Sequence, residues 1–246
     1  MESSISRRDL LAGAAVGPLA RAPQQPGARS ATSTRLKVVF TGGHPGDPEC
    51  GCAGTIARYS DIGCQVTIVY LNRGDAYCGT DELKHCATIR TAEAEKACQI
   101  LKARPVFAGQ YDGRAVIDNT HYEEFQKVLE GETPDLVFTQ WPIDQHRDHR
   151  AVSALTLDAW LKGGKKFALY YYEVADDTMM FAPTEYVDIS AVEDRRRAAC
   201  FAHSSQGPEK WYAAQTEITR FRGVESGHPQ AEAFLKHPQS QRGLLP

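Results

Sequence analysis

The sequence lacks two features that would place it in a membrane or on nucleic acid. Crossing a bilayer takes about 18 or more consecutive apolar residues, and no run here approaches that length. Mean hydropathy is −0.42. The 28 basic residues are spread among 31 acidic ones, for a net charge of −3, whereas phosphate binding requires concentrated positive charge. These absences exclude a polytopic membrane protein and argue against nucleic acid as the main partner.

The cysteines also lack the spacing of a structural zinc site, because no C-x-x-C pair occurs. The seven are Cys50, Cys52, Cys64, Cys78, Cys86, Cys98 and Cys200. Most are expected to be small core residues. No disulfide is assigned, although an oxidising destination would make Cys78 and Cys86 a candidate pair.

The first 34 residues differ in composition from the rest of the chain. Arg7 and Arg8 precede a short Ala/Gly-rich apolar stretch, and residues 20–22 supply an A-x-A cleavage pattern. This segment resembles a bacterial twin-arginine export signal. We expect residues 1–22 to be a signal peptide and residues 23–34 a flexible linker, with the protein exported to the periplasm or beyond and no stable membrane span afterwards. A disordered tail that contains two arginines by chance is the alternative.

Strand and helix patterns alternate from residue 35 onward. Strands are expected near residues 36–40, 65–71, 106–108, 135–139, 167–174 and 186–189, and helices near 51–62, 85–102, 122–129, 151–161, 192–202 and 209–221. This alternation predicts a single α/β domain over residues 35–246, Rossmann-like, with a mainly parallel sheet and helices on both faces. Residues 227–246 are expected to be extended and to pack on a neighbouring subunit of a homo-oligomer.

Histidines and aspartates gather in two loops that follow predicted strands. His44 and Asp47 come after the first strand, and His149 comes after the fourth. Ligands of such sheets bind beyond the carboxyl ends of the strands. Two imidazoles and a carboxylate with an open position are typical of catalytic zinc. The alternative is a set of polar loop residues that cap helices, with Asp47 as an N-cap.

A dinucleotide site is the rival interpretation of the glycine-rich turn after the first strand. That site needs G-x-G-x-x-G, whereas residues 42–46 read G-G-H-P-G, with histidine and proline where the pyrophosphate needs bare backbone. The second predicted strand also lacks an acidic residue at its end. The sequence therefore argues against NAD.

The same two loops carry a family resemblance. Residues 44–55 resemble the H-P-D-D-x-E-x-G-x-G-G-T segment of the PIG-L/LmbE-like zinc deacetylases, and residues 146–149 resemble their H-x-D-H segment. Further similar segments are residues 71–75, 89–93, 109–113 and 203–206, so the likeness spans roughly residues 36–234. The resemblance implies removal of the acetyl group from N-acetylglucosamine units in small glycoconjugates or glycolipids.

Residue by residue, the resemblance implies the following roles. His44, Asp47 and His149 would bind Zn²⁺. His146 would stabilise the tetrahedral oxyanion, and Asp148 would orient a histidine.

Two further residues fall where the family contacts the sugar. Arg90 and Asp112 would bind the substrate, a small N-acetylated amino sugar or glycoconjugate. Arg90 could instead be a surface residue paired with a neighbouring glutamate. His203 lacks metal spacing and is expected to be a surface or supporting group.

One position departs from the family pattern. Where the family has the aspartate that acts as general base, this chain has Gly46. Three alternatives stay open: another group such as Glu49 or His146 takes the role, the hydrolase is weakened, or the protein is a zinc-dependent sugar binder. An active hydrolase is favoured because the other site residues are intact.

Overall fold

The computed structural model describes residues 35–78, 83–175 and 177–246. They belong to one compact unit, Arg35–Pro246. The predicted signal peptide and linker lie outside the described residues. Within the described part of the chain, no helix is both long and apolar enough to span a membrane.

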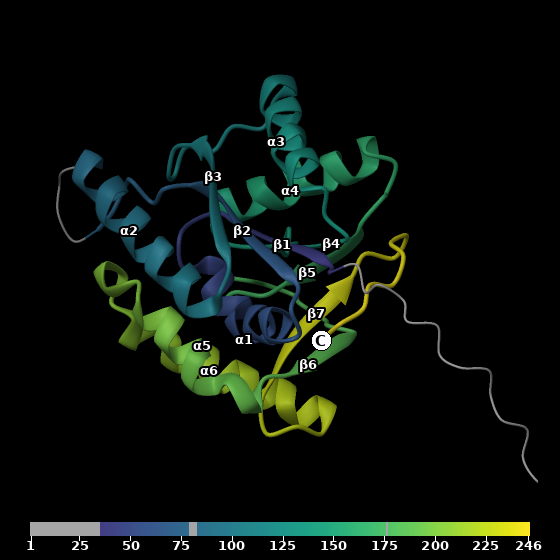
Figure 1. Cartoon of the computed structure of the whole chain (residues 1–246). Helices are drawn as coiled ribbons and strands as arrows, with labels where there is room; N and C mark the ends of the chain where they lie inside the picture. The colour runs from purple at the N-terminus through teal and green to yellow at the C-terminus, as the bar shows by residue number, and fades with distance from the viewer. Residues whose placement is uncertain (1–34, 79–82, 176) are drawn as a thin grey trace, which may run out of the picture. The chain divides into compact units, whose positions relative to one another are not determined.

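A seven-stranded sheet runs through the centre of the domain (Figure 1). Its order is β3-β2-β1-β4-β5-β7-β6. The strands are β1 (Lys37–Gly42), β2 (Gln65–Asn72), β3 (Arg104–Gln110), β4 (Leu136–Gln140), β5 (Ala168–Tyr172), β6 (Glu185–Asp188) and β7 (Ala231–Lys236). Strands β1 to β5 pair in parallel, and β7 is antiparallel to both of its neighbours. The predicted α/β fold with a mainly parallel sheet is confirmed.

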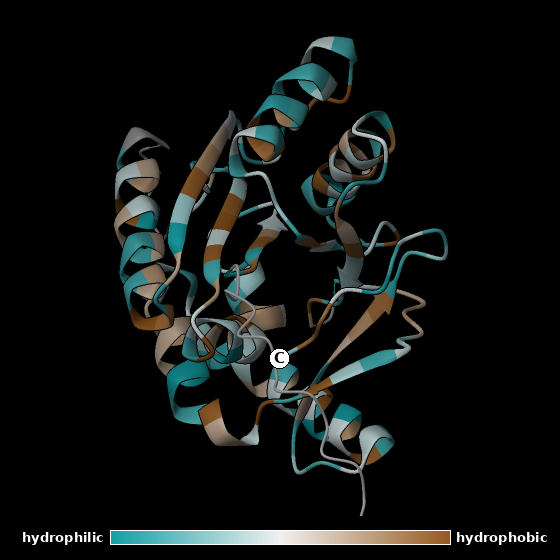
Figure 2. Cartoon of the chain, turned by 45° about the vertical axis from the view of Figure 1, so that its right-hand side comes forward, coloured by the Kyte–Doolittle hydropathy of each residue, from teal (hydrophilic) through white to brown (hydrophobic). Residues whose placement is uncertain are grey.

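Helices cover both faces of this sheet. They are α1 (Asp47–Asp61), α2 (Leu83–Leu101), α3 (Asn119–Glu132), α4 (Arg147–Lys162), α5 (Glu193–Phe201) and α6 (Pro208–Ser226). Buried residues of α1, α2 and α5 share one core cluster with the sheet, and those of α3 and α4 share the other. Figure 2 accordingly shows hydrophobic segments along the strands and hydrophilic segments on the helices.

The expectation that residues 227–246 pack on a neighbouring subunit is wrong for β7. This strand enters the chain's own sheet between β5 and β6. Ala231, Ala233 and Phe234 are buried there. Between them, the Glu232 carboxylate accepts hydrogen bonds from the backbone N–H groups of Gly54 (2.8 Å) and Thr55 (2.7 Å) in α1. A buried carboxylate with two charge-assisted hydrogen bonds is well satisfied, so β7 is fixed to its own domain.

Helix α1 approaches the sheet closely because of a glycine. A Cβ atom at Gly51 would lie 2.6 Å from the Glu173 carbonyl oxygen and 2.6 Å from the ring of Tyr172. No real side chain tolerates such distances, so only glycine allows this approach. The contact matters for function because α1 begins at Asp47, the predicted zinc ligand.

We therefore expect Gly51→Ala to destabilise the fold by about 1–3 kcal/mol, since the added methyl group overpacks a rigid backbone contact. Gly131 in α3 is the matched control, because nothing lies within 4 Å of its would-be Cβ. Gly131→Ala should stabilise by about 0.5–1 kcal/mol. Urea unfolding measures both changes, and wild-type stability of Gly51→Ala would contradict the close packing.

Candidate active site

The two predicted loops meet at one edge of the sheet, because β1 and β4 are hydrogen-bonded parallel neighbours. His44 and Asp47 lie where β1 turns into α1. His146 caps the N-terminus of α4 by accepting the Asp148 N–H, and His149 lies in the first turn of that helix. The loops that carry the predicted ligands are thus brought together as expected.

Asp47 lies between the two predicted histidine ligands. Its Oδ2 atom is 3.1 Å from His44 Nδ1 and 3.1 Å from His149 Nε2. Burial alone would raise the pKa of Asp47, but the neighbouring charges of His149 and His44 hold it well below its usual value. The carboxylate is therefore kept ionised in a largely buried position, which suits a metal ligand.

The outer nitrogens of both histidines face other carboxylates. His44 Nε2 is 3.2 Å from Asp148 Oδ2 and 3.0 Å from Asp112 Oδ1. His149 Nδ1 is 3.0 Å from Asp144 Oδ1. Carboxylates at the outer nitrogens orient metal-binding imidazoles and fix their tautomers. The inner nitrogens face Asp47, an arrangement in which these three residues could hold one ion.

A third imidazole stands beside this pair. The ring of His146 is 4.5 Å from that of His44 and 4.8 Å from that of His149, centroid to centroid. Nitrogen atoms of these three rings could hold a metal ion. A second possible set consists of a His44 nitrogen with carboxylate oxygens of Asp112 and Asp148. We favour the set with Asp47, because its oxygen contacts two inner nitrogens at once. That choice leaves His146 free to face a substrate.

Burial and charge both act on His146. Burial lowers its pKa, and the nearby charges of His44 and His149 lower it further. Its Nδ1 atom accepts the backbone N–H of Asp148 at 3.2 Å. The neutral ring therefore carries its proton on Nε2, and the side chain lines the cavity described next.

A cavity of about 500 Å³ opens over these residues. His44, Asp47, His146 and His149 line one side, and Tyr77, Ala175 and Trp211 are among the residues that line the rest. Pockets for small molecules typically measure about 300–1,000 Å³. The cavity therefore has the size of a site for a small molecule.

Both predicted substrate-binding residues also line this cavity. Arg90 is 5% exposed, so its alternative as a surface residue is wrong. It donates to the Pro45 carbonyl at 2.8 Å and lies 3.7 Å from Asp112 Oδ2. Its Nε atom has no hydrogen-bond partner within the protein. One buried donor is thus left over, beside Gly74.

Sequence reasoning missed Asp144, a 2% exposed residue in the loop before α4. Its Oδ1 contacts His149 and accepts the backbone N–H of His146 at 2.8 Å, and its Oδ2 accepts the Thr178 hydroxyl at 3.0 Å. The only signal was its place in the same loop as the predicted ligands. Contacts at the outer nitrogens therefore come from three carboxylates: Asp112 and Asp148 at His44, and Asp144 at His149.

His203 was expected to be a surface or supporting group, and its burial excludes a surface position. It is completely buried and lines the cavity. The residue follows α5, a helix that packs against α1 and α2, and its Nε2 atom is 3.3 Å from Glu49 Oε1. The only sequence signal was the family likeness of residues 203–206, because the position of His203 depends on how distant helices pack.

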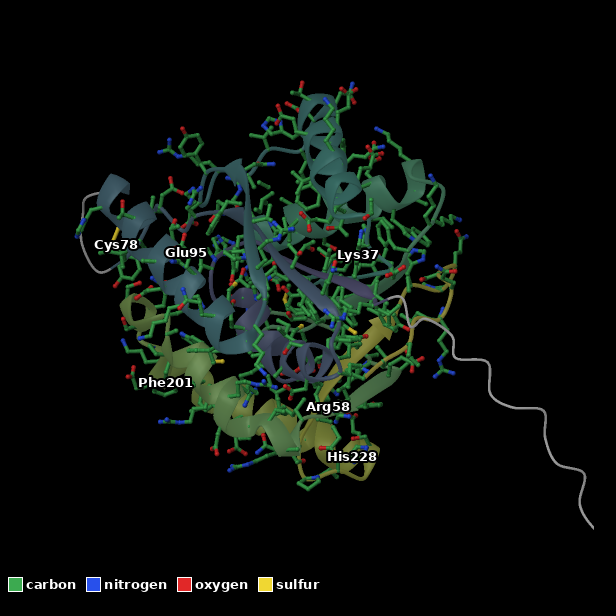
Figure 3. All side chains as sticks on the ribbon, viewed as in Figure 1. Lys37, Arg58, Cys78, Glu95, Phe201 and His228 are labelled. Atoms are coloured by element: carbon green, nitrogen blue, oxygen red, sulfur yellow. A yellow bond between two sulfur atoms is a disulfide. The ribbon has the colours of Figure 1, made fainter. Side chains whose placement is uncertain are left out.

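A disulfide joins Cys78 and Cys86, the pair named from the sequence. Figure 3 places the Cys78 sulfur beside the start of α2. The bond ties the chain segment that carries Tyr77, at the cavity, to the helix that carries Arg90. The other five cysteines are free, and all but Cys64 are buried as expected.

The position of Asp144 generates a prediction. Asp144→Asn should weaken Zn²⁺ binding by about 10- to 100-fold, because the neutral amide orients His149 less well. Competition with a chromophoric chelator measures the change. Asp194→Asn, an exposed carboxylate in the first turn of α5, is the control and should bind Zn²⁺ normally. Equal affinities in the two variants would exclude a role for Asp144.

Comparisons with known proteins agree with the geometry. The diacetylchitobiose deacetylase of Thermococcus kodakarensis is 27% identical over 228 residues, covering 80% of this chain and 82% of that protein. The solved structure of the conserved protein TT1542 from Thermus thermophilus has a TM-score of 0.74 at 29% identity, over 85% of this chain and 97% of that one.

The structure of the N,N'-diacetylchitobiose deacetylase from Pyrococcus horikoshii shares the fold, with a TM-score of 0.75 at 24% identity over 83% of this chain and 85% of that one. The family described as PIG-L, GlcNAc-PI de-N-acetylase, matches residues 39–160, a range that contains both histidine loops. Residues 39–160 of this chain therefore form a PIG-L family domain.

Proposed function

We propose that this protein is a zinc-dependent N-deacetylase that hydrolyses the acetamide of an N-acetylated amino sugar, such as an N-acetylglucosamine unit of a small glycoconjugate. The observation that carries the proposal is the contact of Asp47 with the inner nitrogens of both His44 and His149 at the wall of a sugar-sized cavity. Membership of a deacetylase family supports the reaction class. The sugar specificity rests on relatives that are diacetylchitobiose deacetylases.

The donor set fits zinc. Two imidazole nitrogens and one carboxylate oxygen are ligands that Zn²⁺ accepts readily, and three protein ligands leave a position open. When bound, the ion polarises the amide carbonyl and lowers the pKa of the attacking water. A hard cation such as Mg²⁺ would favour an all-oxygen set.

His146 is assigned to the developing oxyanion. Its Nδ1 is occupied by the Asp148 N–H, so its Nε2–H is the group left to donate. A donor held in place before the reaction stabilises negative charge without reorganisation. Its lowered pKa keeps the ring neutral near pH 7, so the proton is available as a hydrogen bond to the substrate.

The rest of the cavity suits a sugar. Arg90 and Asp112 line the cavity and offer a donor and an acceptor for hydroxyl groups. Trp211 and Tyr77 add aromatic surface on which an apolar sugar face can stack. The substrate is therefore a small molecule, and no basic surface for nucleic acid enters the proposal.

Replacement of a ligand tests the proposal. His149→Ala should bind Zn²⁺ more than about 100-fold more weakly, a larger effect than loss of an outer partner, and should release no acetate. Metal analysis and acetate release from a panel of N-acetylated amino sugars measure the two effects. The control is His228→Ala, whose ring is exposed at the end of α6 (Figure 3).

Two outcomes would count against the proposal. Stoichiometric zinc in His149→Ala would remove His149 from the site. Wild-type protein that binds zinc and sugar but releases no acetate from any member of the panel would instead be a sugar-binding protein, as the missing carboxylate at Gly46 allows.

We also propose that the protein is exported. The twin arginines Arg7 and Arg8 and the A-x-A pattern support a cleaved signal. The Cys78–Cys86 disulfide supports an oxidising destination. Proteins that carry twin-arginine signals cross the membrane folded, so the metal would be inserted first.

Export predicts a mature chain that begins at Pro23. Replacing Arg7 and Arg8 together with Lys should retain the intact chain in the cytoplasm. N-terminal sequencing and cell fractionation measure both, and the Arg21→Lys variant is the control. Finding only the intact Met1 form in wild-type cells would refute export.

A further inference from the structure

We infer that His203, oriented by Glu49, is the proton-transfer residue of this site and takes the place of the carboxylate that position 46 lacks. The inference rests on the proposed deacetylase function. It assigns a catalytic role to a residue that lies far from both histidine loops in the sequence.

The first observation is the position of His203 relative to Gly46. A Cβ atom built at Gly46 would lie 3.7 Å from His203 Cγ and 3.9 Å from His203 Nδ1. A side chain at position 46 would therefore start in contact with this imidazole. Both residues line the same cavity as His44, Asp47 and His149.

The second observation is an unmet hydrogen-bonding capacity. His203 is 0% exposed, yet neither ring nitrogen makes a hydrogen bond of good geometry within the protein. A buried imidazole whose hydrogen-bonding capacity is not met destabilises the folded protein. Such a group at a cavity wall is suited to a partner that arrives with the substrate, and the attacking water and the leaving amine are such partners.

The third observation is the carboxylate next to it. Glu49 Oε1 is 3.3 Å from His203 Nε2 and also accepts the hydroxyl of Tyr70, and its Oε2 accepts the backbone N–H of Gly46 at 3.1 Å. A carboxylate at one ring nitrogen orients an imidazole that transfers protons at the other nitrogen. The hydrogen bonds from Tyr70 and Gly46 hold Glu49 beside Nε2, so Nδ1 is the nitrogen left to accept a proton.

The backbone around His203 is held firmly. Glu93 of α2 accepts hydrogen bonds from the Ser204 hydroxyl (2.9 Å) and from the N–H and hydroxyl of Ser205 (2.7 Å each). The His203 N–H donates to the Cys200 carbonyl at 3.2 Å. A proton-transfer group must keep its geometry through the reaction, and these contacts provide that.

The other candidates for this role are committed elsewhere. Glu49, unlike His203, is not among the residues that line the cavity. His146 has its Nδ1 bound to the Asp148 N–H and its Nε2–H assigned to the oxyanion. A ring that donates a hydrogen bond to the oxyanion cannot at the same moment accept a proton from water.

His203 takes up one proton and returns it within each cycle of hydrolysis. The water oxygen bonds to the amide carbonyl carbon, and one water proton moves to His203 Nδ1. The C–N bond then breaks as His203 returns that proton to the leaving nitrogen. The products are acetic acid, which ionises, and the free amine of the sugar, and no oxidant or reductant is needed.

The first test is His203→Gln, which keeps the volume and polarity of the side chain but cannot carry a proton. We expect kcat for acetate release to fall by about 10²-fold or more, the scale of general acid–base catalysis. The Michaelis constant, the zinc content and the melting temperature should stay near their wild-type values. The exposed His228→Gln is the control and should change none of them.

The second test restores a carboxylate at position 46. Gly46 has φ +108°, where a side chain is strained, so Gly46→Ala is needed to measure the backbone cost. In the His203→Gln background, Gly46→Asp should turn over at least about 10-fold faster than Gly46→Ala. In the wild-type background, the ratio of the same two variants should be near one.

The outcomes of these two tests separate the role of His203 from the deacetylase proposal. A kcat for His203→Gln within about threefold of wild type, with zinc bound, overturns the role of His203 while the deacetylase proposal stands. A loss of kcat that follows zinc content, or an equal Asp-to-Ala ratio in both backgrounds, also overturns it. Absence of acetate release from zinc-loaded wild-type protein overturns both proposals.

Discussion

The parallel pairing of β1 with β4 is the constraint on which this protein depends. Val38 to Phe40 align with Leu136 to Phe138, and both strands end at the same edge of the sheet. Strands β1 and β4 are far apart in sequence, so only this pairing brings the β1–α1 turn beside the start of α4. If the register slipped by one residue, the side chains of one strand would exchange faces, and the two histidine loops would no longer match.

The histidine and carboxylate charges at this edge of the sheet link metal binding to the release of protons. Burial alone would lower the pKa of both histidines, but Asp47 and the other carboxylates raise the pKa of His44 well above its usual value and that of His149 to about 9. Without metal, protonated rings therefore neutralise the surrounding carboxylates near pH 7. A divalent ion must displace those protons, so binding releases them to solvent.

The sequence was sufficient wherever short-range patterns determine the structure. Strand ends, helix starts and the H-P-G-D turn fix His44, Asp47 and His149 locally, and the rule for parallel sheets then joins them. It was insufficient for β7, because A-E-A-F-L-K has weak strand character and becomes a strand only by pairing with β5 and β6. Asp144 was missed although it lies in the same loop as the predicted ligands, because no pattern marks which nearby carboxylate meets His149. The buried position of His203 could not be predicted because it arises from tertiary packing, in particular of α5 on α1.

The position of β7 has a consequence for biosynthesis. Strand β6 is synthesised before β7, yet its only strand partner within the described residues is β7. While residues 231–236 are still inside the ribosome, β6 lacks its native partner and β5 has an unpaired edge. The nascent chain therefore carries an open sheet edge until β7 has emerged, and open edges of this kind invite pairing with other chains.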